Sequence, residues 1–128
     1  MACYDRALRV LPMISVMGSI FLLSHQPGTT LQLAVPPGAD KLGHAVLYAL
    51  LAGTALFALL PVPPQRTLRT GILVVLICFL YGIGDEVHQA FVPGREASVG
   101  DLLADVAGAA IVVALWLRRT VCRQPTTP

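Results

Sequence analysis

The chain has 128 residues, of which 55% are hydrophobic and only 12% are charged. A soluble domain carries about twice that charged fraction, so the composition excludes an ordinary water-soluble fold and indicates one membrane-embedded domain. The formal net charge of +2, without a basic patch interleaved with aromatic residues, also excludes nucleic acid as a partner.

Four apolar segments follow one another along the chain, separated by turns that contain proline. Segments of about 17–25 apolar residues cross a bilayer, where only helices and closed barrels satisfy the backbone. No segment shows the alternation of barrel strands, so the sequence predicts an all-α bundle of four transmembrane helices in a single domain, residues 1–128. The first and last segments are slightly short and need their flanking residues to span the membrane. The predicted helices cover residues 8–24, 42–60, 71–92 and 101–117.

Arginine and lysine residues divide unevenly between the two ends of such a bundle. If the N-terminus is cytoplasmic, the cytoplasmic segments hold seven of the nine basic residues, and the outer segments hold only Lys41 and Arg95. Short cytoplasmic loops carry an excess of positive charge, so we expect both termini on the cytoplasmic side. The same orientation puts all three histidines and six of the seven acidic residues in the outer half.

Polar side chains recur at helical spacing near the outer ends of three predicted helices. Residues three, four or seven apart share one face of a helix. An ionised side chain inside a bilayer costs about 2.5–3.5 kcal/mol, so these residues need partners or a task. We therefore predict that they converge in one polar cavity that opens to the outer side. The predicted ligand-binding residues are Lys41, His44, Tyr48, Tyr81, Asp85, Glu86, His88, Gln89, Arg95, Asp101 and Asp105.

Simpler interpretations exist for some of these side chains. Tyr48 and Tyr81 suit the headgroup region of a bilayer. Asp101 suits the N-cap of the helix that follows it. Asp85 and Asp105 lie roughly one to two turns inside their predicted helices, which is too deep for capping. These two aspartates are therefore the residues for which we most expect a function.

Three ordered blocks of residues carry a resemblance to a known family. The blocks are Asp40-Lys41-x-x-His44-x-x-x-Tyr48, Asp85-Glu86-x-x-Gln89-x-Phe91-x-Pro93-Gly94-Arg95, and Ser98-x-x-Asp101-x-x-x-Asp105-x-x-Gly108-Ala109. In order and spacing they resemble the VanZ family of membrane proteins, and with the intervening helices they cover residues 40–113. One position departs from the family pattern, because Asp105 stands where the family commonly has asparagine.

The resemblance implies a small four-helix integral protein of the inner (cytoplasmic) membrane of a bacterium. The family is named for low-level resistance to the glycopeptide teicoplanin. Its partners would then be the lipid bilayer and a lipid-linked or glycopeptide ligand on the extracytoplasmic side.

Three classes of function are compatible with these residues. We favour a non-enzymatic envelope protein whose cavity binds a polar group of a cell-wall precursor, a lipid headgroup or a glycopeptide, since Lys41 and Arg95 suit phosphate or carboxylate. The second class is a structural subunit whose polar residues only lock the helices together. The third class is an intramembrane hydrolase or transferase, and the spacing matches no zinc-protease motif. No cofactor is expected, although a divalent metal ion stays open as an alternative. Candidates for catalysis are Asp85, Glu86, His44 and Asp105.

Overall fold

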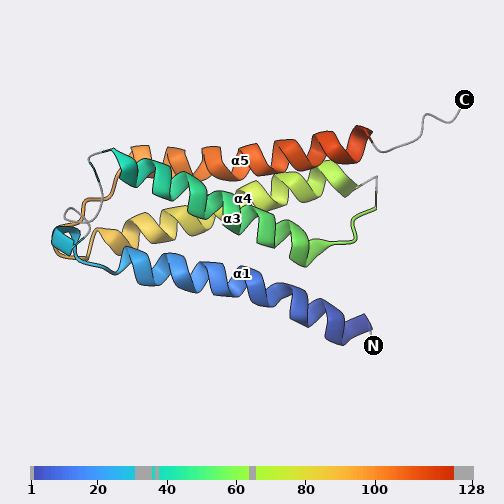
Figure 1. Ribbon diagram of the computed structural model, residues 1–128, viewed down its shortest axis with the longest axis horizontal. Coiled ribbons are helices and arrows are strands. Elements are labelled where there is room, and N and C mark those ends of the chain that lie inside the picture. The colour runs from blue at the N-terminus through green and yellow to red at the C-terminus, as the bar shows by residue number, and fades with distance from the viewer. Residues whose placement is uncertain (1, 31–35, 37, 64–65, 123–128) are drawn as a thin grey trace, which may run out of the picture.

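The structure is a computed structural model that describes residues 2–30, 36, 38–63 and 66–122. Long α-helices joined by turns and loops make up the fold (Figure 1). Residues 28–30 are helical as well, and the described residues contain no strand. The predicted all-α fold is therefore confirmed. The long helices are α1 (Ala2–Ser24), α3 (Ala39–Leu59), α4 (Thr67–Gln89) and α5 (Val99–Cys122).

All four helices are long and apolar enough to cross a membrane. α1 has 23 residues and α5 has 24. At a rise of about 1.5 Å per residue each is roughly 35 Å long, which exceeds the hydrocarbon core of about 30 Å. The predicted segments 8–24 and 101–117 are shorter because they stop at the polar flanks, and arginine continues a helix well.

α4 differs most from its predicted range of 71–92. It begins at Thr67 and ends at Gln89. Residues 90–94 form turns and a bend instead. A helix cannot continue through Pro93, which has no amide to donate and whose ring clashes with the preceding turn.

Consecutive helices run in alternating directions, so the start of α1 and the end of α5 lie at the same end of the bundle (Figure 1). α3 packs most extensively on α5 and also contacts α1 and α4. α4 lies against α5, while α1 packs mainly on α3. α3 is therefore the central helix of the bundle.

The buried interior is small, and the outer surface is strongly apolar. Tyr48, Leu51 and Val74 are completely buried. Large apolar side chains on the helix faces that point away from the interior are exposed; Leu42 and Ile111, for example, are 67% and 60% exposed. A continuous apolar surface of this kind is what a helix bundle presents to the hydrocarbon chains of a bilayer.

α3 and α5 approach each other closely at Gly108. A Cβ atom added there would overlap the carbonyl oxygen of Ala45 on α3. Ala109, the next residue of α5, is fully buried. Small residues at such positions let transmembrane helices pack backbone against backbone. The absence of a side chain at Gly108 therefore sets the distance between α3 and α5.

We predict that Gly108→Ala destabilises the folded protein by about 1–3 kcal/mol, because the new methyl group must push one helix away from the other. Unfolding by SDS in mixed micelles, followed by circular dichroism, measures the loss. Gly53→Ala is the matched control, since nothing lies within 4 Å of a Cβ atom added at that helical position. Equal stability of the Gly108→Ala variant and the wild type would contradict this account of the packing.

Candidate functional site

A cavity of about 850 Å³ lies at the end of the bundle where α1 and α4 end and α3 and α5 begin. Its walls include seven of the predicted ligand-binding residues, so we call it the polar cavity. Asp40 and Glu96 contribute further carboxylates to the lining. The fold thus gathers charges of both signs from segments that are far apart in the sequence. The seven predicted residues that line the polar cavity are Lys41, His44, Tyr48, Asp85, Gln89, Arg95 and Asp101.

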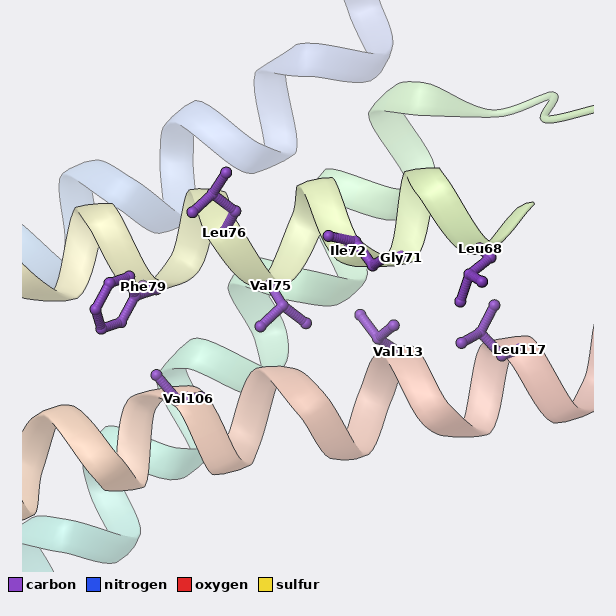
Figure 2. A pocket seen from close by; sticks show the side chains of 9 residues that line it. All are labelled: Leu68, Gly71, Ile72, Val75, Leu76, Phe79, Val106, Val113 and Leu117. Carbon is purple, nitrogen blue, oxygen red and sulfur yellow. The ribbon is translucent and has the colours of Figure 1, made fainter. Parts of the chain in front are cut away.

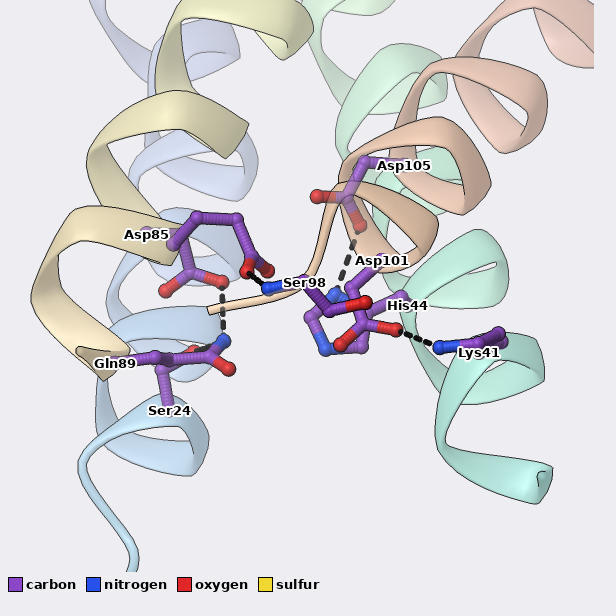
Figure 3. Close-up of polar contacts among 9 residues, drawn as sticks. Ser24, Lys41, His44, Asp85, Gln89, Ser98, Asp101 and Asp105 are labelled. Carbon is purple, nitrogen blue, oxygen red and sulfur yellow. Dashed lines mark hydrogen bonds and ion pairs between the residues drawn. The ribbon is translucent and has the colours of Figure 1, made fainter. Parts of the chain in front are cut away.

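Two polar pairs join α3 to α5 on one side of the polar cavity (Figure 3). The Lys41 ammonium donates to Asp101 Oδ1 at 2.7 Å. One turn deeper, His44 Nδ1 lies 2.9 Å from Asp105 Oδ1. When Asp105 is ionised, its carboxylate can only accept, and the imidazole Nδ1–H is then the donor in this bond. The spacings of three residues on α3 and four on α5 keep both pairs in register.

Asp105 lies behind the cavity rather than in its wall. Its side chain is 0% exposed, and its second oxygen, Oδ2, has no hydrogen-bond partner among the described residues. Gly82 of α4 makes room for this oxygen, since a Cβ atom added to Gly82 would lie 3.0 Å from it. Asp105 is therefore a buried hydrogen-bond partner of His44. It orients the imidazole ring from the side that faces away from the polar cavity.

A second polar group joins α4 to α1. Gln89 donates from its Nε2 atom to Asp85 Oδ2 at 3.1 Å and lies 3.2 Å from Ser24 Oγ at the end of α1. All three side chains are buried, and Figure 3 shows the contact between Gln89 and Asp85. This arrangement holds Asp85 by one oxygen, while the residue itself lines the polar cavity.

Glu86 reaches the α3–α5 side of the site. Its Oε2 atom accepts a hydrogen bond of 2.6 Å from the Ser98 amide, just before α5. Its Oε1 atom is buried and has no partner within the described residues. Ligand atoms of Glu86, His44 and Asp101 all lie within 4.8 Å of one another. Among the described residues, this is the cluster that could hold a metal ion.

The two loops at this end of the bundle meet backbone to backbone. The Gly28 amide donates to the Pro93 carbonyl at 3.2 Å, and a Cβ atom on Gly28 would overlap the carbonyl group of Gly94. Gly94 has a positive φ of 75°, which favours glycine. Both glycines line the polar cavity, so the glycine contact helps to close its wall.

Tyr81 and His88 are not brought into the polar cavity, contrary to the prediction. The Tyr81 hydroxyl donates to the Met17 carbonyl of α1 at 2.7 Å. His88 Nε2 lies 3.3 Å from His25 Nδ1, and the His88 ring packs on Phe21 with centroids 4.7 Å apart. Both side chains thus attach α4 to α1.

Helical geometry explains this correction. At about 100° per residue, Tyr81 and His88 lie roughly 40° and 60° to one side of Asp85. Glu86 and Gln89 lie roughly 100° and 40° to the other side. The first side packs on α1. On the second side, Gln89 lines the polar cavity and Glu86 reaches Ser98, just before α5. Lying on the same broad face of the helix as Asp85 was therefore not enough to predict that a side chain reaches the polar cavity.

Ser24 and Ser98 contact the site, although neither was among the predicted ligand-binding residues, and Ser98 was named only as the first residue of the third block. Both occupy the ends of segments, where a serine is ordinarily a helix cap or a turn residue. The Ser98 carbonyl oxygen accepts a hydrogen bond from the Asp101 amide at 3.0 Å. The Ser98 amide donates a second hydrogen bond, to Glu86. The position of Ser98 directly before α5 was the available signal.

A second hollow lies between α4 and α5, away from the polar cavity (Figure 2). It measures about 380 Å³ and is lined only by apolar residues, among them Phe79, Val106 and Leu117. A binding site needs a few polar groups to orient its ligand, and this hollow offers none. The polar cavity is therefore the candidate functional site.

Comparison with known proteins agrees with this organisation. The family model described as VanZ/LLP1 matches residues 9–121, which include most of all four helices and every lining residue of the polar cavity. No curated protein and no solved structure gave a significant match. The chain therefore belongs to the VanZ/LLP1 family, and it is a multi-pass membrane protein.

Proposed function

We propose that the protein binds an anionic polar group of a cell-envelope ligand in the polar cavity. The ligand class comprises lipid-linked cell-wall precursors, lipid headgroups and glycopeptides, which present phosphate or carboxylate groups. The family-level link to teicoplanin resistance agrees with such a ligand. In this proposal the protein acts by binding and does not itself catalyse a reaction.

The observation that carries the proposal is the state of Arg95. Arg95 lines the polar cavity, yet no carboxylate among the described residues lies within ion-pair distance of its guanidinium group. Arginine forms strong two-pronged hydrogen bonds with carboxylate and phosphate. An arginine without a protein partner in a mixed-sign cavity is therefore available to an anionic ligand.

The size and the composition of the cavity support the same interpretation. Small-molecule sites commonly have volumes of about 300–1,000 Å³, and the polar cavity measures about 850 Å³. Leu23 and Leu47 line it together with the charged residues. A ligand with an anionic head and an apolar portion, such as a lipid-linked precursor, would match both kinds of surface.

The cavity should open to the extracytoplasmic side of the inner membrane. Of the nine basic residues, the six at positions 6, 9, 66, 69, 118 and 119 belong to the opposite end of the bundle, and short cytoplasmic segments attract such an excess. Envelope precursors and glycopeptides are then reachable from the side on which the cavity opens.

Cysteine labelling in intact cells tests this orientation. We expect Ala39→Cys, near the mouth of the polar cavity, to react with a membrane-impermeant maleimide before the inner membrane is permeabilised. The matched variant Thr67→Cys, at the other end of α4, should react only afterwards. The native residues Cys3, Cys78 and Cys122 are replaced by serine in both. Reversed accessibility of the two positions would contradict the proposed orientation.

Replacing Arg95 tests the proposed binding contact. Arg95→Gln should weaken binding at least about tenfold, because a charge-assisted hydrogen bond contributes about 1.5–3 kcal/mol. The assay titrates fluorescently labelled teicoplanin and a lipid-linked cell-wall precursor against the protein in nanodiscs. Arg118→Gln removes the same charge from the far end of the bundle and should leave the affinity unchanged. If neither probe binds the wild type, or if Arg95→Gln binds as tightly, the proposal is wrong.

Asp85→Asn separates a binding role from a purely structural one. The amide keeps an oxygen for Gln89 but replaces the free carboxylate oxygen, which can accept from a hydroxyl or N–H group of the ligand, by a donor. We therefore expect folding to be retained while ligand binding falls at least about tenfold. His88→Ala, a change outside the polar cavity, is the control and should bind normally. Thermal unfolding in detergent is measured for both. A large loss of stability in Asp85→Asn, by about 3–5 kcal/mol, would instead indicate a structural network.

A further inference from the structure

We propose that His44, Glu86 and Asp101 form a binding site for one divalent transition-metal ion, with Asp105 as a positioning residue for His44. The site lies where α3, α4 and the start of α5 meet, at the back of the polar cavity. It goes beyond the proposed ligand binding and does not depend on which ligand the cavity accepts.

Each of the three side chains has one atom engaged by the protein and a second atom without a partner in the described part of the chain. His44 uses Nδ1 for Asp105, which leaves Nε2. Glu86 uses Oε2 for the Ser98 amide, which leaves the buried Oε1. Asp101 uses Oδ1 for Lys41, which leaves Oδ2. The three residues belong to three different helices, and each keeps one free ligand atom.

The spacing of these residues suits an ion after a small contraction. One ligand atom from each of the three side chains lies within 4.8 Å of the other two. Around a tetrahedral ion with bonds of about 2.0–2.2 Å, neighbouring ligand atoms are roughly 3.3–3.6 Å apart. The side chains therefore need to close in by about an ångström. The hydrogen bonds on their outer atoms hold all three in place for this closure.

Glu86 provides the independent sign of a missing ligand. Its side chain is only 7% exposed, and its Oε1 atom is a buried acceptor without a donor among the described residues. Leaving a buried charged group unsatisfied costs about 1–3 kcal/mol or more. A cation bound to Oε1 would remove that penalty, and the neighbouring imidazole and carboxylate supply the rest of its coordination.

Asp105 has the position expected of a residue that orients a metal-binding histidine. Histidines that bind metals almost always donate their other ring N–H to a carboxylate, a carbonyl or water, which fixes the tautomer and the ring orientation. Asp105 accepts from His44 Nδ1 at 2.9 Å and is completely buried. Nε2 is then the unprotonated nitrogen, which is the form that coordinates a metal ion.

The balance of charge at this end also favours a divalent cation. Four buried carboxylates belong to Asp85, Glu86, Asp101 and Asp105. Among the described residues, the only lysine or arginine in ion-pair contact with any of them is Lys41. Buried carboxylates in a membrane protein need compensating charge. One divalent ion at the cluster would supply two positive charges without adding a side chain.

The ligand types narrow the choice of ion. One imidazole and two carboxylates suit Zn²⁺, Mn²⁺ or Fe²⁺ better than Ca²⁺ or Mg²⁺, which prefer oxygen ligands alone. Three protein ligands leave a coordination position open, and His44 and Asp101 line the polar cavity. An anionic ligand or water in the cavity could therefore complete the coordination of the ion.

The test uses full-length protein in detergent, stripped of metal with a chelator. Isothermal titration with ZnCl₂ should show one site per chain, and Co²⁺ should give the intense visible absorption of a tetrahedral site. Glu86→Gln keeps an oxygen for the Ser98 amide and should weaken Zn²⁺ binding at least about tenfold. Asp105→Asn should weaken it about 10–100-fold. Circular dichroism and gel filtration establish that both variants are folded.

The control removes the two remaining histidines, His25 and His88, which lie outside the proposed site. His25 and His88 have ring nitrogens 3.3 Å apart and could bind Zn²⁺ by themselves. The double variant His25→Ala/His88→Ala should keep wild-type affinity. Loss of binding in this variant, retention of binding in Glu86→Gln, or no binding by the wild type would each overturn the metal site. None of these outcomes bears on the Arg95 contact, so the two proposals fail separately.

Discussion

The structure depends on one constraint, which is that a charged side chain within a membrane must have a partner. α3 and α5 meet this constraint with two stacked pairs, Lys41 with Asp101 and His44 with Asp105. Removing Lys41 or His44 leaves a buried aspartate unpaired, which is far more costly than an exposed pair is stabilising. These pairs therefore fix the register of the two helices as well as the geometry of the polar cavity.

Close backbone packing makes this pairing feasible. Gly108, one turn along α5 from Asp105, allows α5 to reach the Ala45 carbonyl, next to His44 on α3. In the loops beside the polar cavity, Gly28 and Gly94 meet in the same way. Wider separation would place the carboxylates of α5 out of hydrogen-bonding range of α3. Glycine thus acts here through the space that it leaves, and the polar contacts depend on that space.

The polar residues of α4 serve two different purposes on its two sides. Tyr81 and His88 attach the helix to α1, and their polar atoms are occupied there. Asp85 and Glu86 are each held by one oxygen and keep the other oxygen available. This half-engagement distinguishes a site from a structural network, since a network that only stabilises has no reason to leave buried acceptors without donors.

The amino-acid sequence by itself determined the class of the protein. Its four apolar segments required four helices, because a bilayer leaves the backbone no other open arrangement, and their polar ends had to gather at one end of an alternating bundle. Helical spacing also placed Lys41 with His44, and Asp101 with Asp105, on one face of their respective helices. Only the tertiary structure decided which stripe meets which. The rotation of α4 turned His88 toward α1 and Glu86 toward Ser98, and such a rotation depends on packing against three neighbours at once, which periodicity within one helix does not encode.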